Sequence, residues 1–237
     1  MPFQQQAERH NMYTCVHKGI RALMQHTLYE AGRCDWRDDL ESQAAASQLR
    51  EMMELMYSHL HHEDAFIHAA MEARRPGSAL QTSGDHHEHV LAIKAFLAGA
   101  DALEAADLAE RARMGADVYR RLGLFVSENL EHMVVEETDN NAVLWACYSD
   151  EELRGIEHAL VSSIPPERHG KFLRWMLPAM NTAERIALLA GARQGMPPQV
   201  FQEVLGNMRP LLSERDWGKL LEGLGIGRQS AQEALAA

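Results

Sequence analysis

The chain has 237 residues, of which 46% are hydrophobic, and its formal net charge at pH 7 is −11. This length allows one large domain, or one domain with an extension. The acidic balance argues against nucleic acid and anionic membranes as partners, because both need a basic face. No apolar run approaches the ~20 residues needed to cross a bilayer. The start of the chain lacks an apolar signal region, and the three cysteines have no CxxC spacing. These features predict a cytoplasmic protein.

Alanine, leucine, glutamate, methionine and arginine dominate the sequence and β-branched residues are few, which predicts an all-α fold. Apolar residues at helical spacing predict four long helices, over residues 5–31, 39–74, from about 85, and 108–147. The first is expected to end near Gly32. Ser83 or Asp85 is expected to cap the third.

The apolar residues of each predicted helix form a stripe along one face. Each stripe is interrupted by histidine, or by histidine with a carboxylate. The interrupting residues are His17, then His59 with Glu63, then His86 with His89, then His132 with Glu136. Spacings of three and four residues place both members of a pair on one helix face. In an antiparallel bundle of four helices the stripes converge on one axis. The sequence therefore predicts that these side chains meet inside the protein.

Five imidazoles and two carboxylates buried together would be costly if they were unpaired. A metal centre removes that cost. Neutral imidazole suits iron, zinc, copper or nickel, and a carboxylate can bridge two ions. A structural zinc site usually closes with four ligands, often including cysteine, and the cysteines lie off these stripes. The pattern favours a site for two metal ions.

Four segments resemble the hemerythrin-like, or HHE cation-binding, family in order and in spacing. They are VHKGIRALM (16–24), HLHHEDAFIH (59–68), DHHEHVLAI (85–93) and EHMVVEE (131–137). The resemblance covers residues 10–148. It implies an up-down four-helix bundle over residues 1–148. It also implies a non-haem di-iron centre whose two iron ions are bridged by two carboxylates and an oxo or hydroxo group.

The resemblance also implies a ligand set. His17 and His59 would hold one iron, Glu63 and Glu136 would bridge, and the second iron would take His86, His89 and His132. The oxygen carriers of the family have H-x-x-x-H on the third helix, where this chain has Val90 at the second position. His89 is therefore the nominated ligand and His87 its rival.

The fourth helix departs from the family pattern too. The carriers have H-x-x-x-x-D there, whereas this chain offers Glu136 or Glu137. Glu136 is favoured because a spacing of four from His132 keeps it on the stripe. Near the second helix, His61 and His62 are expected to point elsewhere. His68, five residues past Glu63, is expected at most to hydrogen-bond a ligand.

Residues 149–237 have a different composition and many residues that typically begin or end a helix. SDEE (149–152) and NTAE (181–184) read as capping boxes, and prolines break the chain between them. We expect a series of shorter helices that packs on the bundle and ends in a frayed tail. No catalytic motif stands out in this segment.

The leading hypothesis is a di-iron protein that handles O2, NO or peroxide as a sensor, carrier or redox protein of a stress response. An open position on the iron with two histidines would admit the ligand. One alternative is an enzyme that turns over peroxide or NO, or repairs iron centres. Another is an interaction protein with a metal-stabilised bundle. The sequence does not decide the oligomeric state, and a homodimer stays open.

Overall fold

The computed structural model describes residues 9–227, and all regular structure in this range is helical. The first part of the chain contains α1 (Thr14–Arg33), α2 (Asp39–His62), the π-helix η1 (Glu63–His68), α3 (Ala69–Arg74), α4 (Leu80–Ala105), α5 (Leu108–Val135), the π-helix η2 (Glu136–Asn140) and α6 (Asn141–Cys147). It is followed by α7 (Asp150–Ser163), α8 (Pro166–Ala179), α9 (Thr182–Gly195), α10 (Pro198–Met208), the 3-10 turn η3 (Arg209–Leu211) and α11 (Glu214–Gly223). Within the described range, no helix combines the length and apolarity that a membrane span needs.

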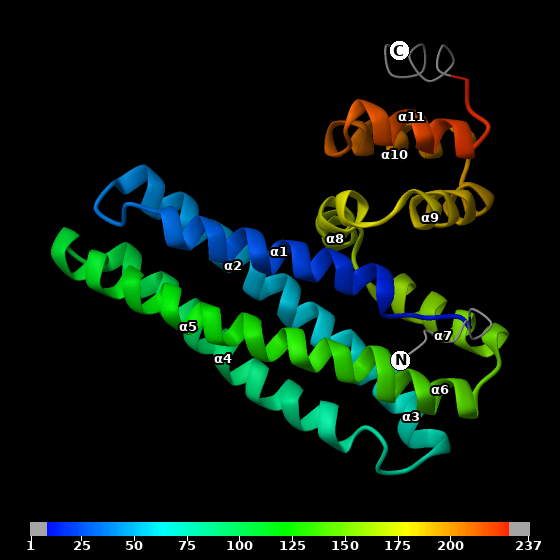
Figure 1. Cartoon of the computed structure of the whole chain (residues 1–237), viewed down its shortest axis with the longest axis horizontal. Coiled ribbons are helices and arrows are strands. Elements are labelled where there is room, and N and C mark those ends of the chain that lie inside the picture. The colour runs from blue at the N-terminus through cyan, green and yellow to red at the C-terminus, as the bar shows by residue number, and fades with distance from the viewer. Residues whose placement is uncertain (1–8, 228–237) are drawn as a thin grey trace, which may run out of the picture.

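Four long helical segments lie side by side (Figure 1). α1 contacts α2 and α5, and α4 contacts the same two helices. The predicted helix over 39–74 is confirmed as the unbroken run α2–η1–α3, and the one over 108–147 as α5–η2–α6. Each of these runs contains one π-helical turn, which the apolar spacing did not predict.

Two predicted helix starts are wrong. The first helix begins at Thr14, where the Asn11 side chain accepts hydrogen bonds from the backbone of Tyr13 and Thr14. The predicted start at residue 5 lies outside the described residues. α4 begins at Leu80, so the predicted caps Ser83 and Asp85 lie inside it. The Glu72 carboxylate accepts from the backbone of the preceding turn, which fixes this earlier start.

The main hydrophobic core fills the space between the long helices. It includes Leu23, Met52, Ile93, Leu122 and Phe125, all at most 2% exposed. Leucine and methionine at helical spacing bury these faces, and the burial of each such side chain is worth ~1.5–3 kcal/mol. The apolar stripes of the sequence thus lie where the spacing predicted.

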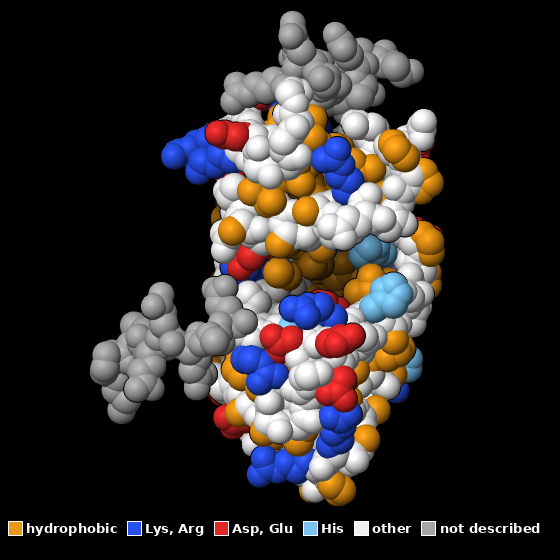
Figure 2. Space-filling model, turned by 90° about the vertical axis from the view of Figure 1, so that its right-hand side faces the viewer, with side chains coloured by type: hydrophobic (Ala, Val, Ile, Leu, Met, Phe, Trp, Pro, Cys, Tyr) orange, Lys and Arg blue, Asp and Glu red, His pale blue; other side chains and the backbone are white. Residues whose placement is uncertain are grey.

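A second core forms within the C-terminal helices, with Phe201, Leu205, Trp217 and Leu220 among its members. The capping boxes predicted at Ser149 and Asn181 both form, at the starts of α7 and α9. Of the predicted frayed tail, residues 228–237 lie outside the described residues. On the face shown in Figure 2, acidic and basic side chains lie beside one another, and hydrophobic side chains are visible on the upper part, which α8–α11 form.

α8 joins the two parts, because it packs along α1. The crossing is close at Gly19, where a Cβ atom would lie 3.0 Å from the backbone of Met176. Phe172 of α8 belongs to the main core. An ion pair between Lys18 and Glu184 at 2.6 Å connects α1 with α9. The C-terminal helices are therefore held against α1.

Gly115 on α5 gives a test of the packing. A Cβ atom there would lie 2.3 Å from the ring of Trp36, which is 8% exposed. Gly115→Ala should lower the free energy of unfolding by about 1–3 kcal/mol, because the ring must move. Urea denaturation followed by helical circular dichroism measures this.

Gly123 on the same helix is the matched control, because a Cβ atom there meets nothing within 4 Å. Gly123→Ala should leave stability unchanged or raise it by up to about 1 kcal/mol through helix propensity. Equal free energies of unfolding for Gly115→Ala and Gly123→Ala would contradict the close packing of Trp36 on α5.

Candidate metal centre

Six of the predicted ligands meet between the long helices. His17 comes from α1, His59 from α2, His86 from α4 and His132 from α5, while Glu63 and Glu136 are the first residues of η1 and η2. Each of the six is at most 6% exposed. Two sets of these residues have ligand atoms within 4.8 Å of one another.

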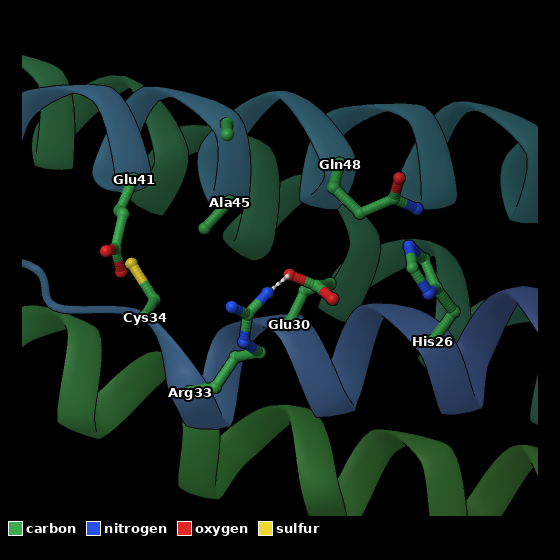
Figure 3. A pocket seen from close by; sticks show the side chains of 8 residues that line it. His26, Glu30, Arg33, Cys34, Glu41, Ala45 and Gln48 are labelled. Carbon is green, nitrogen blue, oxygen red and sulfur yellow. Dashed lines mark hydrogen bonds and ion pairs between the residues drawn. The ribbon is translucent and has the colours of Figure 1, made fainter.

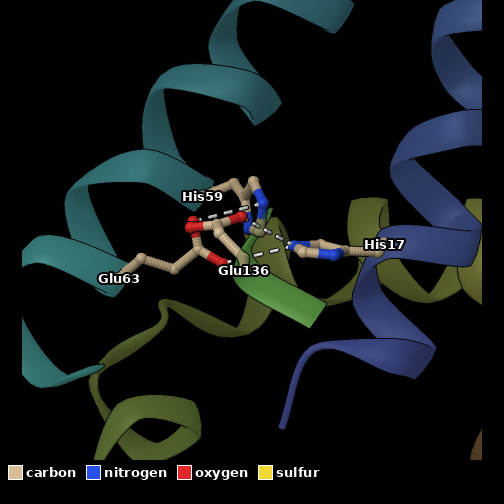
Figure 4. A group of neighbouring side chains, drawn as sticks. All are labelled: His17, His59, Glu63 and Glu136. Carbon is tan, nitrogen blue, oxygen red and sulfur yellow. Dashed lines mark ion pairs between the residues drawn. The ribbon is translucent and has the colours of Figure 1, made fainter. Parts of the chain in front are cut away.

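The first set contains His17, His59, Glu63 and Glu136 (Figure 4). His17 Nε2 lies 3.4 Å from Glu63 Oε1 and 3.4 Å from Glu136 Oε2. His59 Nε2 lies 3.4 Å from Glu63 Oε2. Two imidazole nitrogens and two carboxylates therefore face one small volume.

The second set contains His86, His132 and Glu136. The two Nε2 atoms lie 3.5 Å and 3.3 Å from Glu136 Oε1, and 3.0 Å from each other. Glu63 Oε2 also lies 3.6 Å from His86 Nε2. Glu136 thus directs one oxygen to each set, and Glu63 contacts histidines of both. This is the placement that two bridging carboxylates require.

The hydrogen-bonding state of these atoms fits metal ions. His17 Nε2 and all four carboxylate oxygens of Glu63 and Glu136 are buried without a hydrogen-bond partner. The contacts of 3.3–3.6 Å are ion pairs, too long for good hydrogen bonds. An uncompensated buried carboxylate is strongly destabilising, and a cation between the two would offset that cost. The mixed nitrogen and oxygen donors suit a transition metal such as iron.

Carboxylates on the outer side hold two of the imidazoles in place. His86 Nδ1 lies 2.8 Å from Asp64 Oδ1, and His132 Nδ1 lies 3.1 Å from Asp85 Oδ2. An ionised carboxylate only accepts hydrogen bonds, so each Nδ1 donates, and in the neutral imidazole the lone pair is then on Nε2, which faces the interior. Such outer partners orient metal-binding histidines and raise their basicity.

Glu137 plays the same part for His17. Its Oε1 lies 2.9 Å from His17 Nδ1 and 2.6 Å from the Arg21 guanidinium. Glu136 faces the interior and is fully buried, whereas Glu137 is partly exposed. Of the two glutamates that the sequence offered, Glu136 lies among the grouped ligands and Glu137 lies behind one of them.

The pKa values show how strongly the carboxylates act on these histidines. Burial lowers the pKa of His59 to about 4. Burial also opposes charge on His86, but the hydrogen bond to Asp64 and the nearby carboxylate of Glu136 raise its pKa to about 10. Burial disfavours the charged form of Glu137, yet His17 and Arg21 lower its pKa to about 2. Protons and metal ions compete for these nitrogens, so metal binding would release protons.

The nominated ligand His89 is buried but stands apart from both sets. Its ring packs edge-on against the ring of His132, with centroids 5.1 Å apart, and its Nδ1 atom has no hydrogen-bond partner. The rival, His87, lies on the exposed side of α4. The inward face of α4 is therefore the one that carries His86 and His89.

His68 lies closer to the centre than the sequence indicated. It is 5% exposed, and its Nε2 atom is 4.0 Å from Glu136 Oε1. The rings of His68 and His86 are stacked, and both Nδ1 atoms contact Asp64. The π-helical turn explains why the sequence underestimated how close His68 lies to the centre. The turn widens the helix, so residues five apart share a face, as Glu63 and His68 do.

The remaining histidines of the second helix point away from the centre. His61 is exposed and its ring stacks parallel to Tyr57. The Nδ1 atom of His62 contacts the backbone carbonyl of Ser58 within its own helix. Short π-helical turns often occur at functional sites. Here both such turns begin at a carboxylate of the candidate centre.

A separate pocket of about 310 Å³ lies between α1 and α2 (Figure 3). Its lining includes His26, Cys34 and Glu41, and an ion pair between Glu30 and Arg33 at 3.0 Å. Burial raises the pKa of Cys34 to about 11, so its thiol stays protonated at neutral pH. None of the grouped metal-ligand candidates lines this pocket.

Comparison of the chain with protein-family models, curated proteins and solved structures finds no match. The candidate centre therefore stands on its geometry.

Two neighbouring histidines on α4 test the centre directly. His86→Ala should weaken metal binding by more than about tenfold, since loss of a ligand should cost at least as much as loss of an outer partner. His87→Ala should leave binding unchanged, because that side chain is exposed. Competition with a chromogenic chelator measures the affinity. Equal weakening by the two substitutions would contradict the assignment.

Proposed function

We propose that the part of the chain before residue 149 contains a hemerythrin-like four-helix bundle, formed around α1, α2, α4 and α5, that binds two iron ions. The observation that carries this proposal is the pair of buried carboxylates without hydrogen-bond donors, Glu63 and Glu136, each facing imidazoles from several helices. The contacts of α1, α2, α4 and α5 with one another support the bundle arrangement. The ordered sequence segments support the same family.

In this proposal His17 and His59 would hold one iron ion, and His86 and His132 would hold the other. Glu63 and Glu136 would offer a carboxylate to both ions. His89 stays the predicted third histidine of the second iron. A pair of iron ions supplies reversible electron transfer and an open coordination position for a small oxidant. The chain supplies the ligands, their orientation and a buried setting that excludes water.

The composition of the site favours binding, sensing or redox exchange of O2, NO or peroxide over oxygenation. Imidazoles outnumber inward carboxylates, and a histidine-rich set is typical of reversible ligand binding. Outer carboxylates hold His17, His86 and His132 in fixed orientations. A rigid set of ligands suits a site that binds and releases a ligand without rearranging.

The test is metal analysis and absorption spectroscopy of the full chain purified from an iron-supplied culture. We expect about two iron ions per chain, the number of ions that the two carboxylates can bridge, and near-ultraviolet bands that change when O2 or NO is added. Zinc in place of iron, or one ion per chain, would overturn the proposal. Sustained consumption of peroxide or NO would instead show an enzyme.

The adjacent glutamates of η2 provide a matched pair of variants. Glu136→Gln keeps the shape of the side chain but removes charge that both ions share, so at least one ion should be lost while helical content is kept. Glu137→Gln should keep both ions and weaken their affinity by about 10–100-fold, because it removes only the outer partner of His17.

Metal content of the two purified variants distinguishes these outcomes. Glu63→Gln should behave as Glu136→Gln does, because both carboxylates occupy equivalent places. If Glu137→Gln empties the site and Glu136→Gln does not, the bridging role belongs to Glu137.

A further inference from the structure

A row of buried polar side chains runs beside the candidate metal centre. It consists of His68, Thr82, Asn140 and Tyr13, each at most 5% exposed. Thr82 Oγ1 lies 3.1 Å from His68 Nε2 and 3.3 Å from Asn140 Nδ2. Asn140 Nδ2 lies 3.3 Å from the hydroxyl of Tyr13. The row starts at Asp64, which contacts His68 Nδ1 at 2.9 Å.

Asp64 accepts a hydrogen bond from His68 Nδ1. With a neutral imidazole, His68 Nε2 then accepts from Thr82, whose hydroxyl also lies 3.4 Å from the carbonyl oxygen of Ala79. Thr82 Oγ1 accepts from the amide nitrogen of Asn140. An amide nitrogen only donates, so Asn140 also donates to Tyr13. The phenol oxygen of Tyr13 is thus an acceptor in this row, and its own hydrogen remains to be donated.

Among the described residues, the Tyr13 hydroxyl has Asn140 as its hydrogen-bond partner and no acceptor for its own hydrogen. Burying an unused donor costs free energy. A phenol keeps its hydrogen at neutral pH, because its ordinary pKa is about 10. The Tyr13 hydroxyl can therefore still donate one hydrogen bond.

Tyr13 lies next to the candidate centre. Its ring is 5.2 Å from the ring of His17, between centroids. The hydroxyl contacts Asn140, the last residue of the π-helix that begins at Glu136. Both π-helices follow one pattern, with a carboxylate of the centre at the first residue and a member of the polar row, His68 or Asn140, at the last.

We propose that Tyr13 donates a hydrogen bond to the small ligand bound at the metal centre, and so favours ligands that carry an accepting atom. The ligand class is a small anion or oxygen species, for which azide is a suitable probe. This inference rests on the proposed function, since it needs the centre to hold metal. Tyr13 is here a ligand-selecting residue, and its hydrogen bond from Asn140 orients it.

Titration of the iron-loaded full chain with azide, followed by absorption, tests the proposal. Tyr13→Phe removes the hydroxyl and keeps the ring, so iron content should be unchanged and azide should bind about tenfold more weakly, the value of one buried hydrogen bond. Tyr29→Phe is the control, because Tyr29 is 66% exposed. It should bind azide as the unaltered chain does.

Thr82→Val separates ligand contact from general loosening of the row. It removes two hydrogen bonds of the row but leaves the phenol and its contact with Asn140. Azide affinity should then change by less than about twofold, since no donor to the ligand is lost. Equal weakening in Tyr13→Phe and Thr82→Val would show a merely structural role and overturn the proposal.

The remaining outcomes are also decisive. Unchanged azide binding in Tyr13→Phe overturns the ligand contact and leaves the proposed function intact. Loss of iron from Tyr13→Phe assigns the phenol to the structure of the centre, which overturns the proposal too. If the unaltered chain holds iron but binds no azide, the ligand role fails. If it holds no iron, the proposed function fails first and this inference with it.

Discussion

Two glutamates buried without hydrogen-bond donors set the main physical constraint on this protein. Glu63 and Glu136 place four carboxylate oxygens in a space that excludes water. Positive charge nearby makes the burial of an ionised carboxylate tolerable. His17, His86 and His132 can supply part of it, and their outer nitrogens are in turn held by carboxylates nearer the surface. The long helices must therefore keep their mutual register, because every one of them carries a member of this set.

α1 connects the candidate centre to the C-terminal helices. Within five residues it carries His17, which faces the centre, and Arg21, which pairs with Glu137 behind it. Between them lie Lys18, paired with α9, and Gly19, which lets α8 approach closely. The contacts of α8 and α9 with α1 thus help to hold α1 in place. A segment without a recognisable chemical motif still has a structural part in positioning a ligand.

The sequence by itself determined which residues share a face. Leucine, methionine and histidine at spacings of three and four can pack only as helix stripes, so the helical fold and the runs over 39–74 and 108–147 followed from local pattern. The same spacing placed His59, Glu63, His132 and Glu136 inside. Polar groups as dense as these are tolerated in a core only when they meet partners, which is why histidine and glutamate on the apolar helix faces pointed to a metal.

Only the tertiary structure decided what lies around those ligands. Residues five apart point in different directions on an α-helix, so the sequence predicted His68 to lie away from the centre. In the structure a π-helical turn places it beside Glu136. Asp64 looks like an ordinary surface charge in the sequence, and Glu137 was there the rival of Glu136 as a bridge. The contacts that both make with histidines depend on helices more than twenty residues away. The direction of Tyr13 depends likewise on Asn140. Such contacts form between helices, and local spacing carries no information about them.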